Sequence, residues 1–223
     1  MIIEYNSQMN KLKGLLKAAH FGPTLIVTAI SFGFGTYYWW EGPAYIIAFG
    51  VFTGQLVVGW SNDLYDFDDD LKHQRAKKPL VSGLITKQYL IKWLRFMVPF
   101  SFVANLLGPL GVEGGSVYML GIACGVAYNF YFKFSILSPL PYAIAFVALP
   151  SSVALSKDIN PPMWMLLGGA LFGMAAHFIN VIKDMDQDQA SGIKGLPQRL
   201  GKVKSIAAAA VLIVLGITAL VVS

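Results

Sequence analysis

Seven long apolar stretches, separated by short charged segments, dominate this sequence. A helix that crosses the ~30 Å hydrocarbon core of a bilayer needs about 20 apolar residues, because each residue rises ~1.5 Å. The stretches meet this length, and they are too long and too uniformly apolar for the strands of a membrane barrel. We therefore predict an all-α fold, a polytopic transmembrane helical bundle with seven spans. The predicted spans cover about 18–40, 42–62, 89–112, 114–132, 136–156, 161–182 and 203–223.

The scarcity of charge agrees with a membrane protein. Charged residues make up 13% of the 223 residues, about half of the roughly 25% found in soluble domains. So few charges cannot cover a water-exposed surface, which excludes soluble enzymes, disordered chains and nucleic-acid binders despite the net charge of +5. We expect a single transmembrane domain over 1–223, in which residues 1–17 form an interfacial segment before the first span.

Lysine and arginine gather on one side of the predicted bundle. The N-terminal segment and the loops after the second, fourth and sixth spans hold all but one of the 17 basic residues, and the exception is Lys157. Cytoplasmic loops carry an excess of Lys and Arg. We therefore expect an integral, multi-pass membrane protein, in the cell membrane if it is prokaryotic, with its N-terminus and these loops in the cytoplasm.

Eight of the twelve acidic residues fall into two segments with one shared pattern. Residues 62–70 and 180–188 both read N-x-x-x-D-x-D-x-D, at an offset of 118, and the match extends to Pro79 and Pro197. Each segment begins at the cytoplasmic end of an even-numbered span. This arrangement predicts a parallel internal repeat, which would bring the two segments face to face at one cytoplasmic-side cavity.

The spacing of the acids indicates a metal site. Residues four apart lie on one face of a helix, so the acids of each segment form a row of carboxylates that repel one another unless cations neutralise them. Hard oxygen ligands of this kind suit Mg²⁺, which is usually held by one or two carboxylates together with phosphates and waters. The predicted metal ligands are Asn62, Asp63, Asp66, Asp70, Asp184 and Asp188.

Basic residues follow each acidic row, as a metal–diphosphate site requires. Arg75 and Lys78 follow the first row and Lys194 follows the second. A solvated surface run is the alternative for one acidic segment, but two matched segments disfavour it. A calcium loop is excluded, because neither copy has Gly at the sixth position and Glu at the twelfth.

These residues resemble the UbiA superfamily of intramembrane prenyltransferases. Residues 62–70 match the first motif of the family, N-D-x-x-D-x-x-x-D, and Asp184 with Asp188 matches the second, D-x-x-x-D. Arg75 and residues 78–83 resemble R-T-x-x-R-P-L-x-x-G, with Ala and Lys in place of Thr and the second Arg and with one residue fewer between the two basic positions.

A further tyrosine and lysine between the fourth and fifth spans extend the resemblance. Tyr128 and Lys133 resemble the family's Y-x-x-x-K, with one more residue between them. The resemblance implies a UbiA-like bundle around a lipid-facing cavity, in which Mg²⁺ and both Asp motifs bind a polyprenyl diphosphate. It assigns catalytic roles to Asp66, Asp70, Asp184 and Asp188, and diphosphate contacts to Arg75, Lys78, Lys133, Lys194 and Tyr128.

The implied activity is a Mg-dependent transfer of a polyprenyl group to an aromatic or other lipophilic acceptor, among membrane lipids and without nucleic acid. A UbiA-type terpene cyclase, in which the carbocation closes on itself, is the alternative. A divalent-cation transporter is less favoured, because acids in a permeation path lie near the midplane. Family members usually have nine spans and this sequence has seven, so we expect a short member, a truncated chain, or a homo-oligomer whose cavity a second copy completes.

Overall fold

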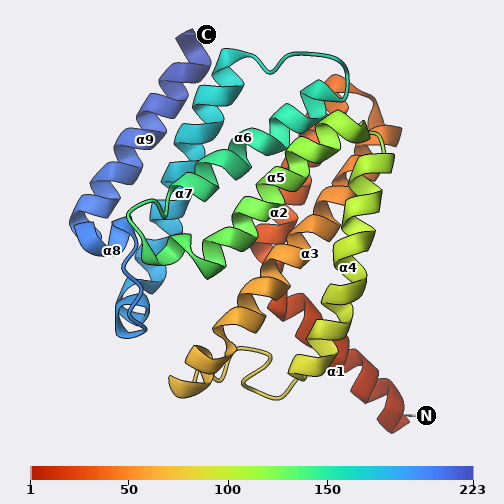
Figure 1. Cartoon of the computed structure of the whole chain (residues 1–223), viewed down its shortest axis with the longest axis vertical. Coiled ribbons are helices and arrows are strands. Elements are labelled where there is room, and N and C mark those ends of the chain that lie inside the picture. Colours follow the sequence, from red (N-terminus) through yellow and green to blue (C-terminus); the bar gives the residue numbers. More distant parts are fainter. Residues whose placement is uncertain (1, 223) are drawn as a thin grey trace. The chain divides into compact units, whose positions relative to one another are not determined.

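The computed structural model describes the backbone of residues 2–222 and the side chains of residues 8–222. All regular elements in this part of the chain are helices (Figure 1), which confirms the all-α prediction. The helices are α1 (Ile2–Ala18), α2 (Phe21–Tyr38), α3 (Glu41–Lys72), α4 (Lys87–Leu107), α5 (Gly111–Phe130), the 3₁₀ turn η1 (Phe132–Phe134), α6 (Leu140–Leu155), α7 (Met163–Ala190), α8 (Leu196–Leu200) and α9 (Lys202–Val222).

Each predicted span contains one long helix, but not every helix is suited to cross a membrane by itself. Among the described residues, α3, α4, α7 and α9 are long and apolar enough to do so. A fifth span results if α1 and α2, which meet at a 68° bend, are counted as one. The α6 helix is apolar but has only 16 residues, and α5 has 20 residues, among them Glu113, Asn129 and several glycines. The seven-span count is therefore not confirmed, because these two helices are too short or too polar.

The chain forms two compact units, residues 1–108 and 109–223. In the first unit α3 packs against both α2 and α4, and α1 contacts α2 and α3. In the second unit α6 packs against α5 and α7, and α7 packs against α9. Each unit contains one acidic segment and the basic loop that follows it. The expectation that 1–223 is one domain stays a prediction.

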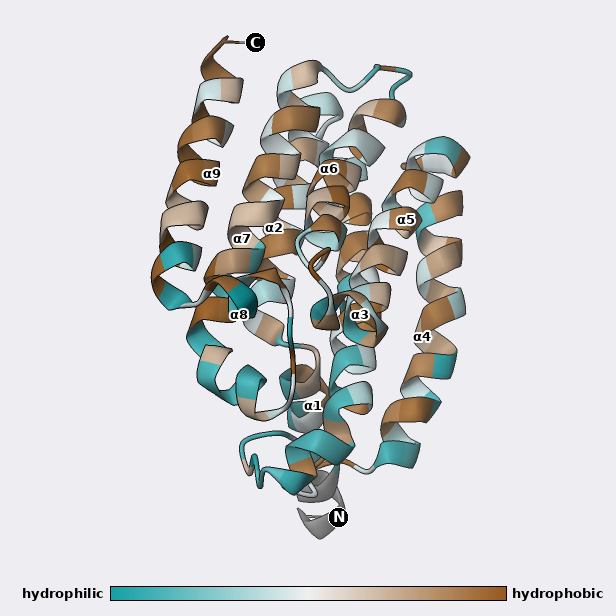
Figure 2. Ribbon diagram, turned by 60° about the vertical axis from the view of Figure 1, so that its left-hand side comes forward, coloured by the Kyte–Doolittle hydropathy of each residue, from teal (hydrophilic) through white to brown (hydrophobic). Residues whose placement is uncertain are grey.

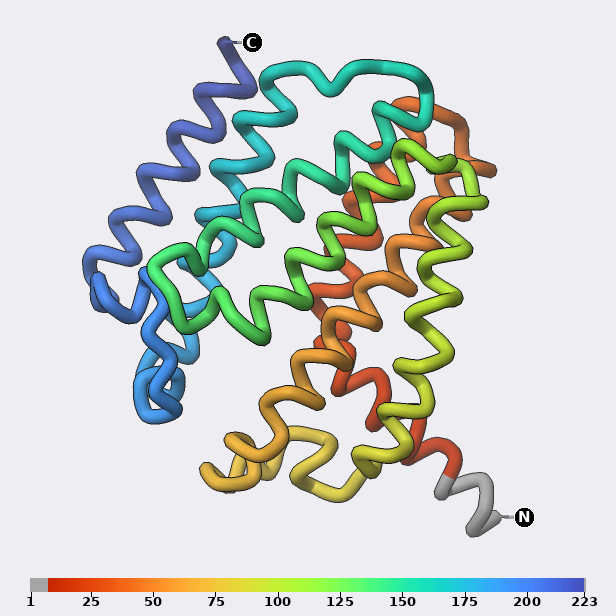
Figure 3. Tube along the Cα trace, viewed as in Figure 1, coloured from red at the N-terminus to blue at the C-terminus, as the bar shows by residue number. Residues whose placement is uncertain are grey.

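The helix boundaries follow the internal repeat that the two acidic segments predict. Adding 118 to the bounds of α2 gives 139–156, and α6 spans 140–155. The same offset takes α3 to 159–190 and α4 to 205–225, against 163–190 for α7 and 202–222 for α9. Figure 3 traces this path of two helices, a loop and a third helix in each unit. In both units the acidic segment thus ends the second of the three matched helices.

In the first unit, the corner between α1 and α2 packs on α3 just before the acidic segment. The indole Nε1 of Trp60 donates a hydrogen bond to the carbonyl of Leu15 at 2.9 Å. A Cβ on Gly59 would lie 2.7 Å from the carbonyl oxygen of Ala19, so only glycine allows the two backbones to approach this closely. This contact places His20, the residue after Ala19, beside the acidic segment.

Figure 2 shows hydrophilic residues at the ends of α3 and α7 that carry the acidic segments, and mostly apolar residues along α9. Many apolar side chains of α9 are exposed, such as Val203 at 81% and Val221 at 79%. A helix with apolar residues on its exposed face suits lipid better than water.

Candidate functional site

The first acidic segment is the last part of α3. This helix continues without a break from its apolar part into the segment, so Asn62, Asp66 and Asp70 share one face, four residues apart. Asp63 and Asp70 are only 2% and 1% exposed, respectively, whereas Asp66 is half-buried. Two carboxylates of one helix are therefore removed from water and require cations or hydrogen-bond donors.

Two basic side chains from the loop after α3 supply these cations. Lys78 Nζ donates to Asp63 Oδ1 at 2.7 Å and lies 3.6 Å from Asp70 Oδ2. Arg75 donates to Asp70 Oδ1 at 2.6 Å, and its other terminal nitrogen lies 3.5 Å from Asp69 Oδ2. The loop thus folds back over the helix that precedes it, and it brings predicted diphosphate ligands against predicted metal ligands.

Apolar anchors hold the loop in this position. Leu80 and Ile85, which are 7% and 3% exposed, pack in the same buried cluster as Leu15, Leu56 and Trp60. The burial of two large aliphatic side chains contributes about 1.5–3 kcal/mol each. The cations of the loop are therefore fixed beside α3 by a core that does not depend on the ion pairs.

The charge state of Lys78 follows from this setting. Burial lowers the pKa of its ammonium. The negative charge and the hydrogen bond of Asp63, together with the negative charges of Asp70 and Asp66, outweigh burial and raise the pKa above its ordinary value. Lys78 thus remains a cation at neutral pH. Asp63 keeps one oxygen, Oδ2, that is buried and has no hydrogen-bond partner among the described residues.

A histidine from the α1–α2 corner completes this cluster. His20 adopts a left-handed backbone conformation with φ of 50°, and its Nε2 lies 3.2 Å from Asn62 Oδ1 and 3.9 Å from Asp63 Oδ1. Asn62 in turn donates from Nδ2 to Asp66 Oδ2 at 3.1 Å. The imidazole thereby orients the amide of Asn62, whose oxygen faces His20 and whose nitrogen faces Asp66.

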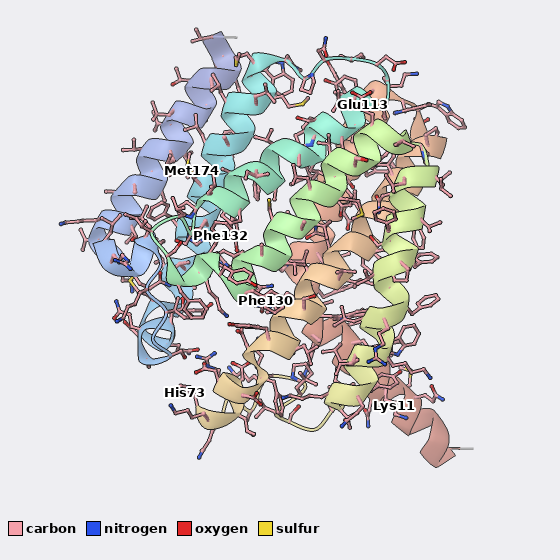
Figure 4. The ribbon with its side chains drawn as sticks, viewed as in Figure 1. Lys11, His73, Glu113, Phe130, Phe132 and Met174 are labelled. Carbon is pink, nitrogen blue, oxygen red and sulfur yellow. The ribbon has the colours of Figure 1, made fainter. Side chains whose placement is uncertain are left out.

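The end of α3 carries further ion pairs that lie on the surface. His73, labelled in Figure 4, follows the last residue of α3, and its Nδ1 lies 3.2 Å from Asp69 Oδ1. Asp68 is exposed, and it accepts a hydrogen bond from Lys87 at 2.9 Å. Asp68 is exposed and Asp69 is half-buried, so both acids are more open to solvent than Asp63 and Asp70.

The second acidic segment lies in the last turns of α7. Asp184 is exposed and Asp188 is half-buried. Asp188 Oδ2 accepts a hydrogen bond from the side-chain amide of Gln198 in α8 at 2.9 Å. The exposed Lys194 lies in the loop between these two helices, and its carbonyl accepts a hydrogen bond from Arg199 at 2.7 Å.

The loop that contains Lys133 contacts the loop that contains Lys194. Phe130 and Phe132, labelled in Figure 4, mark the turn at the end of α5, and Lys133 is 5% exposed. A Cβ on Gly195 would lie 3.0 Å from the carbonyl oxygen of Lys133. The backbones of two predicted diphosphate ligands of the second unit are therefore close neighbours.

Tyr128 belongs to a group of aromatic rings in the same unit. Its ring centroid lies 5.3 Å from that of Tyr142 and 5.5 Å from that of His177. His177 is fully buried, and its Nε2 lies 3.0 Å from the hydroxyl of Ser138. Tyr128 thus packs against the polar centre that links α7 to the loop before α6.

The sequence analysis missed two side chains that form hydrogen bonds to the acidic segments from other parts of the chain. His20 lies 42 residues before Asn62, and Gln198 lies ten residues after Asp188. Neither has a neighbouring acid or a recognisable spacing in the sequence. No local signal identifies them, because their role arises only when the loops fold back.

The donors of both segments fit a hard divalent cation. Among residues with described side chains, no group of three His, Cys, Asp or Glu is gathered to hold a metal ion. Mg²⁺ does not need such a cage, because it binds one or two carboxylates and takes its other ligands from phosphates and water. The buried Oδ2 of Asp63, which has no hydrogen-bond partner in the described part of the chain, is the kind of oxygen that a cation satisfies.

Comparison with known proteins decides the family. Residues 20–223 match the UbiA prenyltransferase family. The chain belongs to this family. The predictions of the family and of a prenyltransferase are therefore confirmed. The enzymes of the family work within membranes, in agreement with the several apolar helices of this chain.

Solved structures agree with this assignment. A UbiA homologue from Archaeoglobus fulgidus bound to DMAPP and Mg²⁺ has a TM-score of 0.76 at 16% identity, covering 92% of this chain and 76% of that one. Its GPP and Mg²⁺ complex has a TM-score of 0.74, also at 16% identity, over 96% and 76% of the two chains. A digeranylgeranylglyceryl phosphate synthase has a TM-score of 0.68 at 20% identity, covering 94% of this chain and 76% of that one. No curated protein sequence matches this chain.

Proposed function

We propose that this UbiA-family protein transfers a polyprenyl group from its diphosphate to an aromatic or other lipophilic acceptor, with Mg²⁺ as the cofactor. One observation carries the proposal: Arg75 and Lys78 lie against Asp63 and Asp70, within 2.6–3.6 Å. Carboxylates that suit a metal and cations that suit phosphate oxygens thus meet in one place. The complexes of the A. fulgidus homologue with DMAPP or GPP and Mg²⁺ support the choice of substrate and cofactor.

The proposed roles divide between the acidic segments and the basic loops. When bound, Mg²⁺ acts as a Lewis acid on the oxygens of the leaving diphosphate and as a template for its orientation. An ammonium has three donors and a guanidinium has five, so Lys78 and Arg75 can bond a carboxylate and a phosphate at the same time. The proposed metal ligands are Asn62, Asp63, Asp66, Asp70, Asp184 and Asp188, and the proposed diphosphate ligands are Arg75, Lys78, Lys133, Lys194 and Tyr128.

The proposed acceptor shares the membrane with the prenyl chain. Departure of the diphosphate leaves an allylic carbocation, and the acceptor forms a bond to its carbon and releases a proton. The excess of Lys and Arg in the N-terminal segment and in the loops that follow the acidic segments favours a cytoplasmic position for both motifs.

The test is turnover by purified protein in lipid with Mg²⁺ and prenyl diphosphates of several lengths, including DMAPP and GPP. Each substrate is offered with and without aromatic and lipid acceptors, and products are identified by mass spectrometry. A prenylated acceptor, with diphosphate released only when the acceptor is present, supports transfer. A hydrocarbon or alcohol formed without acceptor would instead assign a terpene cyclase, and Mg²⁺ flux without turnover would assign a transporter.

Site variants accompany this test. Asp66→Ala and Asp184→Ala each remove one carboxylate, and we expect each to weaken Mg²⁺-dependent binding of the prenyl diphosphate at least tenfold. Calorimetry measures this binding without turnover. Unchanged binding in both variants contradicts the assignment of the acidic segments.

A further inference from the structure

Asp188 occupies an electrostatically unfavourable position. It lies in the last turn of α7, two residues before the helix ends at Ala190. The C-terminal end of a helix carries partial negative charge and disfavours a carboxylate. Asp184 lies one turn earlier on the same face and adds like-charge repulsion. A carboxylate at this position needs hydrogen-bond donors that offset this repulsion.

Gln198 supplies one such donor. Its Nε2 donates to Asp188 Oδ2 at 2.9 Å, and the side chain of Gln198 is only 8% exposed. An ionised carboxylate only accepts hydrogen bonds, so the amide must present its nitrogen to Asp188. A second contact ties the same two helices, since the side chain of Gln189 donates to the carbonyl of Gln198 at 3.4 Å.

The neighbours of Gln198 hold it in this position. The backbone N–H of Leu196 donates to the hydroxyl of Ser138 at 3.0 Å, and the hydroxyl of Ser205 donates to the carbonyl of Pro197 at 3.0 Å. A Cβ on Gly195 would lie 2.7 Å from Gln198 Oε1. The oxygen of the amide therefore lies close to the backbone of Gly195, and its nitrogen donates to Asp188.

The donor from Gln198 is neutral, whereas Lys78 and Arg75 bind carboxylates of the first segment as cations. A neutral amide orients a carboxylate without cancelling its charge, and partners of this kind raise the affinity of metal ligands.

We infer that Gln198 is a positioning residue, which fixes the carboxylate of Asp188 for a divalent cation and the prenyl diphosphate bound with it. This inference rests on the proposed function, because it assigns Asp188 to that site. The side chain of Gln198 acts through Asp188 and does not itself touch the substrate.

The test compares Gln198→Met with the wild type. Methionine keeps the length and volume of glutamine but has no N–H donor. Calorimetry of the detergent-solubilised full chain measures the binding of Mg²⁺ with GPP, and thermal unfolding without Mg²⁺ measures stability. We expect the affinity to fall about tenfold, since loss of a partner that orients a metal ligand typically costs 10- to 100-fold, while the unfolding midpoint without metal stays near that of the wild type.

Two further variants make the result specific. Gln187→Met changes an exposed glutamine next to Asp188, and its affinity should equal that of the wild type. In the Asp188→Ala background, Gln198→Met should have no additional effect, because its partner is already missing. Gln198→Asn, which keeps the amide but is one methylene too short to reach Asp188, should weaken binding as Gln198→Met does.

The outcomes separate this inference from the proposed function. If the wild type binds Mg²⁺ and GPP, Asp188→Ala weakens binding and Gln198→Met does not, the inference is overturned and the proposed function stands. If both Gln198 variants fail to fold without metal, the role of Gln198 is structural and the inference is overturned. If the wild type shows no Mg²⁺-dependent binding of any prenyl diphosphate, the proposed function fails, and the inference fails with it.

Discussion

The pairing of Lys78 with the buried carboxylates of α3 leads to a quantitative prediction. Lys78→Met keeps most of the aliphatic side chain and removes the ammonium that lies 2.7 Å from Asp63 Oδ1 and 3.6 Å from Asp70 Oδ2. Removing one partner of a buried ion pair costs about 3–5 kcal/mol, because the other charge remains buried. Lys78 is itself 24% exposed and Arg75 still holds Asp70, so the lower end of this range, about 3 kcal/mol, applies.

A loss of this size is measurable by thermal unfolding in detergent. For a chain of 150–250 residues, about 1 kcal/mol corresponds to 2–4 °C, so the midpoint without metal should fall by about 6–12 °C. Mg²⁺ should then raise the midpoint of Lys78→Met by more than that of the wild type. The cation replaces the missing charge in the variant, whereas in the wild type it must compete with Lys78.

The control is Lys77→Met at the neighbouring, exposed position. An exposed charge contributes little to stability, so its midpoint should stay within about 2 °C of the wild type. The reasoning is refuted if Lys78→Met unfolds at the wild-type temperature, or if Lys77→Met loses as much. Equal Mg²⁺ shifts in Lys78→Met and the wild type would refute the competition between the ammonium and the metal.

Three further predictions follow from the first unit. His20→Gly keeps the left-handed backbone and removes the imidazole, and it should weaken Mg²⁺-dependent binding of GPP several-fold in calorimetry. His73→Gly, at the surface, should leave this binding unchanged. Equal effects of the two variants would contradict the role of His20 at Asn62. Gly59→Ala should lower the free energy of unfolding by about 1–3 kcal/mol through overpacking. Gly22→Ala, where a Cβ meets nothing within 4 Å, should raise it by about 0.5–1 kcal/mol. Thermal unfolding of both variants tests this prediction. Because the pKa of Lys78 is raised above 10.5, the ammonium contributes fully to the stability of the fold at neutral pH. This contribution is lost only as the pH rises through the raised pKa. If the difference in unfolding midpoint between the wild type and Lys78→Met shrinks between pH 6 and 9, the prediction is wrong.

The parts of the site that sequence analysis predicts are those determined by local periodicity. The shared face of Asn62, Asp66 and Asp70 follows from spacing on a helix, and α3 is continuous through all three residues. The proximity of Arg75 to these acids could also be predicted, because few residues separate them. The number of spans depends on α5 and α6, whose length and polarity lie near the limit for a membrane helix, so periodicity alone does not determine it.

The partners of the acids depend instead on tertiary packing. His20 reaches Asn62 because Gly59 admits the backbone of the α1–α2 corner. Gln198 reaches Asp188 because the loop after α7 turns back onto Ser138. The residues that flank these side chains show no pattern that would predict either contact. Each contact joins two elements that are far apart in the sequence, so it can be recognised only in the three-dimensional structure.

The lengths of α3 and α7 bear on how an amphiphilic substrate meets the enzyme. From Glu41 to Asn62 and from Met163 to Asp184 there are 21 residue steps each, or about 32 Å of helix. That length is close to the ~30 Å of hydrocarbon in a bilayer. If these helices cross the bilayer from their first residues, the first proposed metal ligand of each unit lies where the hydrocarbon core ends and the headgroups begin. A prenyl diphosphate at this depth keeps its tail dissolved in lipid and its charged head hydrated, so the enzyme need not extract either half from the solvent it prefers.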